Sequence, residues 1–338
     1  MKEKFSFLAI DPYQIVTYKE PKEKDLGQNM VGWGDKNDYP DYLLSLYNEV
    51  GVLRTIINGC VDYTVGNGIE GPEWSRELLP KLIHDYWIYG GFCFQVIRNK
   101  LKEPSKYIYV DFRNVRVSKD EEVYYYSEDW TKTLGRCKYI TFPKYNPEDE
   151  NQPTGLVYFK NVFNQYYPTP VYGAKTTILA CEIEKEVTNY HYSSVQNGFV
   201  GGYAFDFRNG IPGDDEKGEI EKDILEKYTG SGNAGRIVIN FSDDNDHGLS
   251  LTKLETEDFG EKYKSLTKKT TQELFTAFRA NPNLFGMPTE NNGFNSEEYE
   301  STFKLFNRTM IKPAQIRIKS LFESFGEEVS FIPFTLED

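Results

Sequence analysis

The feature that most constrains this fold is a pair of long helical segments on either side of a short mixed segment. Residues 172–197 place one stripe of side chains at spacings of three and four: Leu179, Ile183, Val187, Tyr190 and Ser194. A second helix is predicted over 261–280 and ends before Pro282. Between them, residues 199–241 read as strand, helix, strand. The sequence therefore predicts two helices that bracket a compact αβ insert.

A third long helix is predicted near the end of the chain. Asn295 and Ser296 can cap its start, and acidic residues follow in the first turn, where the helix dipole favours them. Its stripe at spacings of three or four consists of Tyr299, Phe303, Phe306, Met310, Ala314, Ile318, Leu321 and Phe325. Pro313 falls inside this stripe, and we expect a helix kink there because proline cannot complete the helical hydrogen bonding.

The first half of the chain mixes helices and strands. An amphipathic helix over 38–60, which Gly51 interrupts or splits in two, precedes a helix over 73–89 that ends at Gly90-Gly91. A strand follows at 92–98, and residues 106–160 contain the strand-like segments KYIYVDF, VRVS, VYYYS, CKYITF and LVYFK. The predicted fold class is α+β.

The charge balance argues against tight binding to nucleic acid. The 338 residues carry a net charge of −13, the opposite of the basic surface that neutralises phosphates. No stretch is long and apolar enough for a secretory signal or a membrane span, so we expect no membrane partner and synthesis in a cytoplasm. The widely spaced Cys60, Cys93, Cys137 and Cys181 are expected to be reduced core residues.

The motifs that could carry chemistry lack their structural context. Glycines at 66, 68 and 71, and again at 230, 232 and 235, fit G-x-G-x-x-G, but neither set follows a strand and opens a helix. At the acidic turn 242–248, His247 and, further on, Leu254 stand at positions where a calcium loop needs oxygen ligands. The three histidines have no metal-ligand spacing. We therefore predict no catalytic residues, no cofactor and no metal.

Two blocks of this sequence resemble the portal proteins of tailed bacteriophages. Near the N-terminus, WGDKNDYPDYLLSLYNEVGVLRTIINGCVDYTVGNGI resembles a W-G-x-x-N-x-Y-P entry, a helix and a V-G-x-G turn. The closing block, from QELFTAFRANPNLFG to NRTMIKPAQIRIKSLF, is the more specific: a helix ends in N-P-x-L-F-G, and after a polar loop comes a helix with T-x-x-K-P. With the segments from YPTPVYGAK and GNAGRIVINF, the resemblance covers roughly 200 residues and leaves out the strand-rich middle.

The resemblance implies a portal fold with parts at defined positions. A mixed α/β wing would span 1–171, stem helices 172–198 and 259–281, and a small αβ clip with return strands 199–258. A tunnel loop region at 282–296 would lead into a kinked wing helix and C-terminal segment at 297–338, with a small or absent crown.

The resemblance also implies function without catalysis. The chain would form a ring of twelve subunits at one capsid vertex of the virion, assembled in the host cytoplasm. Double-stranded DNA would pass through its channel without sequence specificity. Expected partners are the terminase motor, the major capsid protein and a head-tail adaptor protein.

Specific residues follow from this layout. The candidate tunnel loop consists of Pro288, Thr289, Glu290, Asn291, Asn292, Gly293, Phe294 and Asn295. Candidate channel or intersubunit charges on the second stem helix are Lys262, Lys264, Lys268 and Lys269. Two alternatives stay open at this point: another head-tail connector ring protein, and a hydrolase such as a nuclease or glycosidase that uses paired carboxylates.

Overall fold

The chain forms two compact units. The computed structural model describes residues 5–6, 19–132, 136–162, 165–196, 203–207, 213, 216, 218–220, 237–241, 249–253, 259–287 and 296–335. Unit 1 comprises Met1–Thr17 and Glu182–Thr270, and unit 2 comprises Tyr18–Cys181 and Thr271–Asp338. The predicted α+β class is confirmed, since both units combine helices with sheets.

The N-terminal part of unit 2 contains three helices that contribute to its core. These are α1 (Tyr39–Glu49), α2 (Gly51–Val65) and α3 (Glu73–Tyr89). Val50 is extended between the first two, which confirms that the amphipathic stretch splits before Gly51. Gly90 ends α3 in the left-handed conformation, with its N–H on the carbonyl of Tyr86, as helix-terminating glycines often do.

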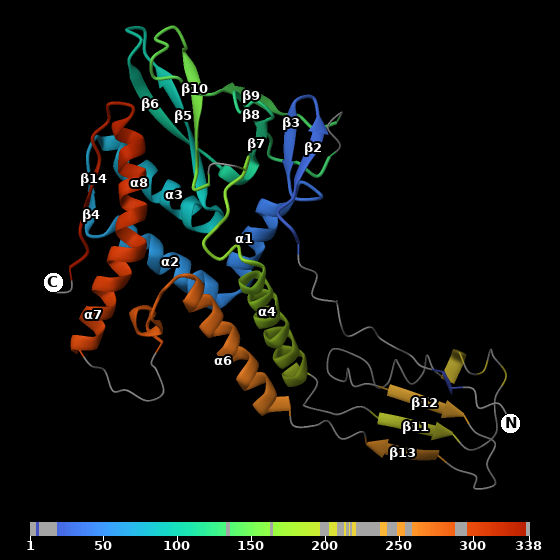
Figure 1. Ribbon diagram of the computed structural model, residues 1–338. Coiled ribbons are helices and arrows are strands. Elements are labelled where there is room, and N and C mark those ends of the chain that lie inside the picture. Colours follow the sequence, from blue (N-terminus) through green and yellow to red (C-terminus); the bar gives the residue numbers. More distant parts are fainter. Residues whose placement is uncertain are drawn as a thin grey trace. The chain divides into compact units, whose positions relative to one another are not determined.

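Two antiparallel sheets complete the first part of unit 2 (Figure 1). The three-stranded sheet has the order β10-β5-β6, from β5 (Gly91–Arg98), β6 (Pro104–Val110) and β10 (Thr154–Lys160). The five-stranded sheet has the order β2-β3-β7-β8-β9, from β2 (Glu23–Gly27), β3 (Met30–Trp33), β7 (Val115–Ser118), β8 (Val123–Tyr126) and β9 (Ile140–Pro143). The short helix η1 (Phe112–Asn114) leads into β7. Phe92, Phe94 and Phe112 are fully buried between these elements and α3.

The C-terminal part of unit 2 packs against its helices. Helix η2 (Pro282–Phe285) precedes α7 (Ser296–Phe306), a π-helical turn η3 (Asn307–Ile311) and α8 (Lys312–Glu323). Strand β14 (Ser330–Ile332) then pairs antiparallel with β4 (Gly68–Glu70).

The π turn explains a break in the apolar spacing of the last helix. The buried residues are Phe303, Phe306, Ile311, Ala314, Ile318 and Phe322, with one spacing of five after Phe306. In an α-helix, a spacing of five places the two side chains about 140° apart. The π turn closes with the N–H of Lys312 on the carbonyl of Asn307, which returns Ile311 to the buried face. Ile311 thus takes the buried position that we expected for Met310.

Unit 1 contains a small four-stranded sheet and parts of two helices. The sheet order is β1-β12-β11-β13, from β1 (Phe5–Ser6), β11 (Tyr203–Phe207), β12 (Ile237–Phe241) and β13 (Leu249–Lys253). β11 and β12 are parallel, and Glu216 and Gly218–Ile220 between them are helical. A parallel pair needs such a crossover. The helices are α4 (Lys175–Gln196) and α6 (Phe259–Ala277), and each continues into unit 2.

Strand β1 departs from the layout expected from the sequence. It pairs antiparallel with β12, so Phe5 lies opposite Asn240. This pairing groups Met1–Thr17 with the αβ insert and separates it from the rest of the 1–171 segment. The two residues have no periodicity that could have indicated this partner.

Two further expectations concern the cysteines and the membrane. All four cysteines are free and buried, which confirms the prediction of reduced core residues. Among the described residues, no helix combines the length and the apolar character that a membrane crossing requires.

Candidate functional site

The structure describes only part of the predicted functional side chains. The candidate tunnel loop, residues 288–295, lies outside the described residues, as does the side chain of Lys262. Lys264, Lys268 and Lys269 are exposed on α6. Pro313 is the second residue of α8, directly after the π turn, in the region where the sequence predicts a kink.

Helices α4 and α6 are joined by a buried polar contact within unit 1. The hydroxyl of Thr270 on α6 donates to Oε2 of Glu184 on α4 at 2.7 Å, and Thr270 is buried. One residue away, Lys269 is exposed. The face of α6 that contacts α4 is therefore distinct from the face that presents its lysines to solvent.

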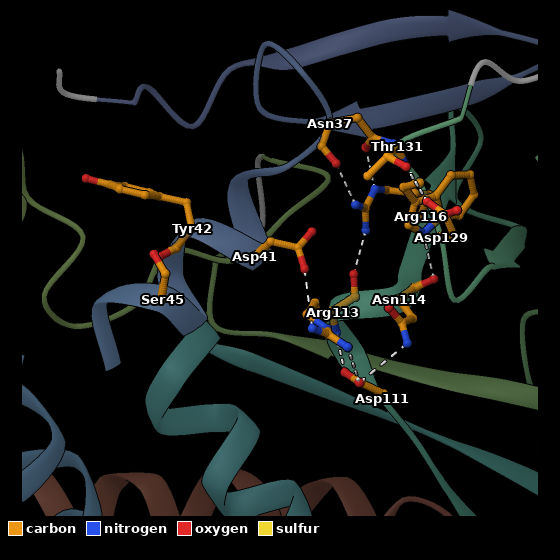
Figure 2. A network of polar contacts seen from close by, with 11 residues as sticks. Asn37, Asp41, Tyr42, Ser45, Asp111, Arg113, Asn114, Arg116, Asp129 and Thr131 are labelled. Carbon is orange, nitrogen blue, oxygen red and sulfur yellow. Dashed lines mark hydrogen bonds and ion pairs between the residues drawn. The ribbon is translucent and has the colours of Figure 1, made fainter. Parts of the chain in front are cut away.

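The W-G-x-x-N-x-Y-P motif forms a buried hydrogen-bonded turn (Figure 2). Asn37 is buried in the left-handed region at φ +60°, and its N–H donates to the carbonyl of Gly34 at 3.0 Å. Its side-chain oxygen accepts from the N–H of Trp33 at 3.0 Å and from Nε of Arg116. The turn thus fixes how the chain leaves β3 and enters α1.

Arg116 on β7 is the centre of this network and is fully buried. Its guanidinium donates to the carbonyls of Asn37 and Arg113 at 2.8 Å and of Val115 at 2.9 Å. It also lies 5.1 Å from the ring centroid of Trp130, a cation–π distance. Burial lowers the pKa of Arg116, but an arginine this basic keeps its charge. Carbonyl dipoles and an aromatic face solvate the cation, so its role is structural.

The V-G-x-G turn holds the C-terminal strand. Gly66 has φ +65°, and a Cβ added there would lie 2.1 Å from the carbonyl oxygen of Ile332. The N–H of Asn67 donates to that same oxygen at 3.0 Å. The first G-x-G-x-x-G match therefore closes the β4–β14 pair, while the second match and the acidic turn 242–248 lie outside the described residues.

The N-P-x-L-F-G motif forms a joint between α2, α6 and α7. The side chain of Asn281 accepts from the N–H of Asn283 at 3.0 Å, and Gly286 ends the short helix at φ +76°. The ring of Phe285 lies over Gly59, where an added Cβ would be 2.5 Å from Cε1. Tyr63 donates to the carbonyl of Leu284 at 2.9 Å. The W-G-x-x-N-x-Y-P, V-G-x-G and N-P-x-L-F-G motifs thus each make tertiary contacts in unit 2.

Reasoning from sequence missed the most connected of these residues. Arg116 alternates with two valines in the strand VRVS, and in such a pattern a charged side chain is expected to face solvent. Tyr63 packs its ring against Phe285, Phe303, Phe306 and Phe334, yet it is one of 25 tyrosines. No local signal distinguishes either residue from its neighbours.

The described residues offer little for acid–base chemistry. Burial, with repulsion from Asp111, raises the pKa of Asp85 well above its ordinary value, and Tyr109 donates to it at 3.0 Å. Asp85 is 4% exposed, so a substrate has no access to it. Within the described part of the chain, no group of three histidine, cysteine or acidic side chains could hold a metal ion.

The fold is similar to solved structures of virus-like particles. It matches a chain in the neck of a native gene transfer agent particle computed with C12 symmetry, with a TM-score of 0.55 and 13% identity, over 88% of this chain and 85% of that chain. A chain in the neck of the empty particle, computed with C6 symmetry, has a TM-score of 0.52 and 14% identity, also over 88% of this chain and 85% of that chain. At this identity the likeness shows a shared fold.

A weaker likeness is to an HK97 family phage portal protein from Corynebacterium diphtheriae. The TM-score is 0.48 at 10% identity, over 86% of this chain and 94% of that chain. No family model and no curated protein matches the sequence. The chain thus has the fold of a component of a gene transfer agent neck.

Proposed function

We propose that this chain is a portal subunit, one of the identical subunits of a ring at a single capsid vertex, through which DNA is packaged and later ejected. The observation that carries the proposal is the fold shared with a chain of a C12-symmetric particle neck over 88% of the sequence. The W-G-x-x-N-x-Y-P and N-P-x-L-F-G motifs support it independently, because they resemble portal proteins.

The elements correspond to the parts that such a subunit needs. The sheets and helices of unit 2 would form the wing, and α4 and α6 the stem. The β11–β13 sheet would form the clip, where a βαβ crossover gives a compact tip. Residues 288–295 would form the tunnel loop that leads into α7.

Charge explains how DNA could slide in such a channel. Twelve copies, each at −13, carry a charge of −156, so most of the ring surface repels a duplex. Strong phosphate contacts along the channel would act as brakes on a moving polyanion. The exposed Lys264 and Lys269 would supply only brief contacts, or ion pairs with acids of the next subunit.

This function includes no catalytic step in the chain itself. Energy for packaging would come from a separate terminase ATPase that docks on the ring. The major capsid protein and a head-tail adaptor would also bind the ring. The ring would assemble in the host cytoplasm and stay in the virion.

The test is electron microscopy of the purified full chain after its mass is measured in solution. We expect rings of about twelve subunits around an open channel that admits a DNA duplex. A compact dimer with a deep cleft would contradict the proposal and favour a hydrolase. A ring with a closed or much narrower centre would favour another head-tail connector component.

A further inference from the structure

The last helical stretch carries an exposed stripe with no partner in the described chain. This outer stripe consists of Leu305, Arg308, Lys312 and Ile316, at spacings of three, four and four. Leu305 is 64% and Ile316 62% exposed, and both aliphatic side chains lie on the same face as the two cations. It runs along α7, the π turn and α8, and its residues alternate with the buried Phe306, Ile311 and Ile318 of the same elements.

The stripe lies in a basic segment of the chain. Residues 301–322 contain five lysines and arginines and no acid, so the other residues together carry −18 to give the total of −13. Within this segment, Lys304 and Lys319 pair with Glu300 at 3.1 Å and with Glu323 at 3.6 Å. Arg308 and Lys312 have no partner among the residues that the structure describes. Two cations are thus available between two exposed aliphatic side chains.

This combination favours a protein partner over nucleic acid. Phosphate contacts would use the two cations but would gain nothing from Leu305 and Ile316. Protein interfaces bury aliphatic side chains together with arginine, and the cations select an acidic surface. A second copy of this chain offers such a surface, because its charge outside the stripe segment is −18.

We propose that the outer stripe is one side of the contact between neighbouring copies in the ring, and that it meets an acidic surface of the next copy. The inference rests on the proposed function, since a ring needs a head-to-tail interface in which two different surfaces meet. In such an interface the stripe of one copy contacts a different surface of the next copy. The contact is therefore expected to weaken at high salt.

The experiment uses full-length variants and native mass spectrometry over a series of protein concentrations. We expect Leu305→Ser with Ile316→Ser, and separately Arg308→Glu with Lys312→Glu, to raise the concentration needed for assembly by about tenfold or more. Circular dichroism must show unchanged folding for each variant. Matched controls are Leu101→Ser, at a 77% exposed leucine, and Lys36→Glu with Lys106→Glu, at two exposed lysines.

The outcomes separate this inference from the proposed function. Rings that assemble equally well from wild type and both stripe variants would refute the inference and leave the portal proposal intact. Stripe-dependent oligomers without an open channel would refute the portal proposal alone. A charge-reversed variant that keeps its rings but loses affinity for duplex DNA would make the stripe a nucleic-acid surface and refute the inference. A wild-type chain that stays monomeric at every concentration would also refute it.

Discussion

Replacement of Arg116 by leucine tests whether the buried network at the start of α1 stabilises unit 2. The guanidinium donates to Asn37 Oδ1 and to three backbone carbonyls. Each buried acceptor that loses its donor costs about 1–3 kcal/mol. Leucine offsets part of that loss because it removes a desolvated charge. We expect the free energy of unfolding to fall by about 3 kcal/mol.

The measurement is urea unfolding followed by tryptophan fluorescence. All four tryptophans, at positions 33, 74, 87 and 130, lie in unit 2, so the signal reports this unit alone. The control is Arg113→Ala, which removes partly exposed ion pairs to Asp41 and Asp111 at 3.4 and 3.5 Å and should cost less than about 1 kcal/mol. If Arg116→Leu lies within about 1 kcal/mol of wild type, the network does not stabilise the unit as argued here.

Two other predictions concern a buried acid and a turn. Because burial raises the pKa of Asp85, its proton stabilises the folded state at low pH, and this contribution is lost as pH rises through the folded-state value. Asp85→Asn should therefore flatten the decline of unfolding free energy as pH rises above about 4, and an unchanged slope would contradict this. Gly66→Ala should displace β14, because the new Cβ would meet the carbonyl of Ile332, and hydrogen exchange at 330–332 should become faster. Full protection there would argue against the close approach.

Helices with strong periodicity could be predicted from the sequence. The expected segment 73–89 is α3 itself, and 172–197 and 261–280 differ from α4 and α6 by a few residues. These helices follow from contacts within a few residues, which a local pattern contains. The strand–helix–strand reading of the insert also agrees with β11, the helical residues 218–220 and β12.

Elements that depend on distant partners could not be predicted. The hairpin of β2 and β3, the short β4 and β14, and the pairing of β1 with β12 all went unrecognised. Strands β1, β4 and β14 have only two or three residues, too few to show alternation, and their partners lie far away in the chain. Strand β2 (EKDLG) has a single large apolar side chain, so its hairpin with β3 shows no alternating pattern either. The π turn was missed because both Met310 and Ile311 are apolar, so the sequence alone fits either spacing.

The structure adds contacts to the sequence-based picture of the candidate site. Lys264, Lys268 and Lys269 are exposed on α6. The roles of these lysines, of the loop 288–295 and of Pro313 stay predictions. The motif residues could be recognised from the sequence as a resemblance. Only the structure shows what they contact, for example that Asn37 accepts a hydrogen bond from Arg116, 79 positions away.

The pairing of β14 with β4 affects how the chain can fold as it is synthesised. Ile69 and Phe331 face each other in that pair but lie 262 positions apart. At about 5–20 residues per second, a ribosome needs roughly 13–50 s between adding the one and the other. During this interval the segment 182–270 emerges while unit 2 still lacks its last helices and strand. Helix α2 can pack against α1 and α3 early, but its contacts with η2, η3, α8 and β14 must wait until the last helices and strand have been synthesised.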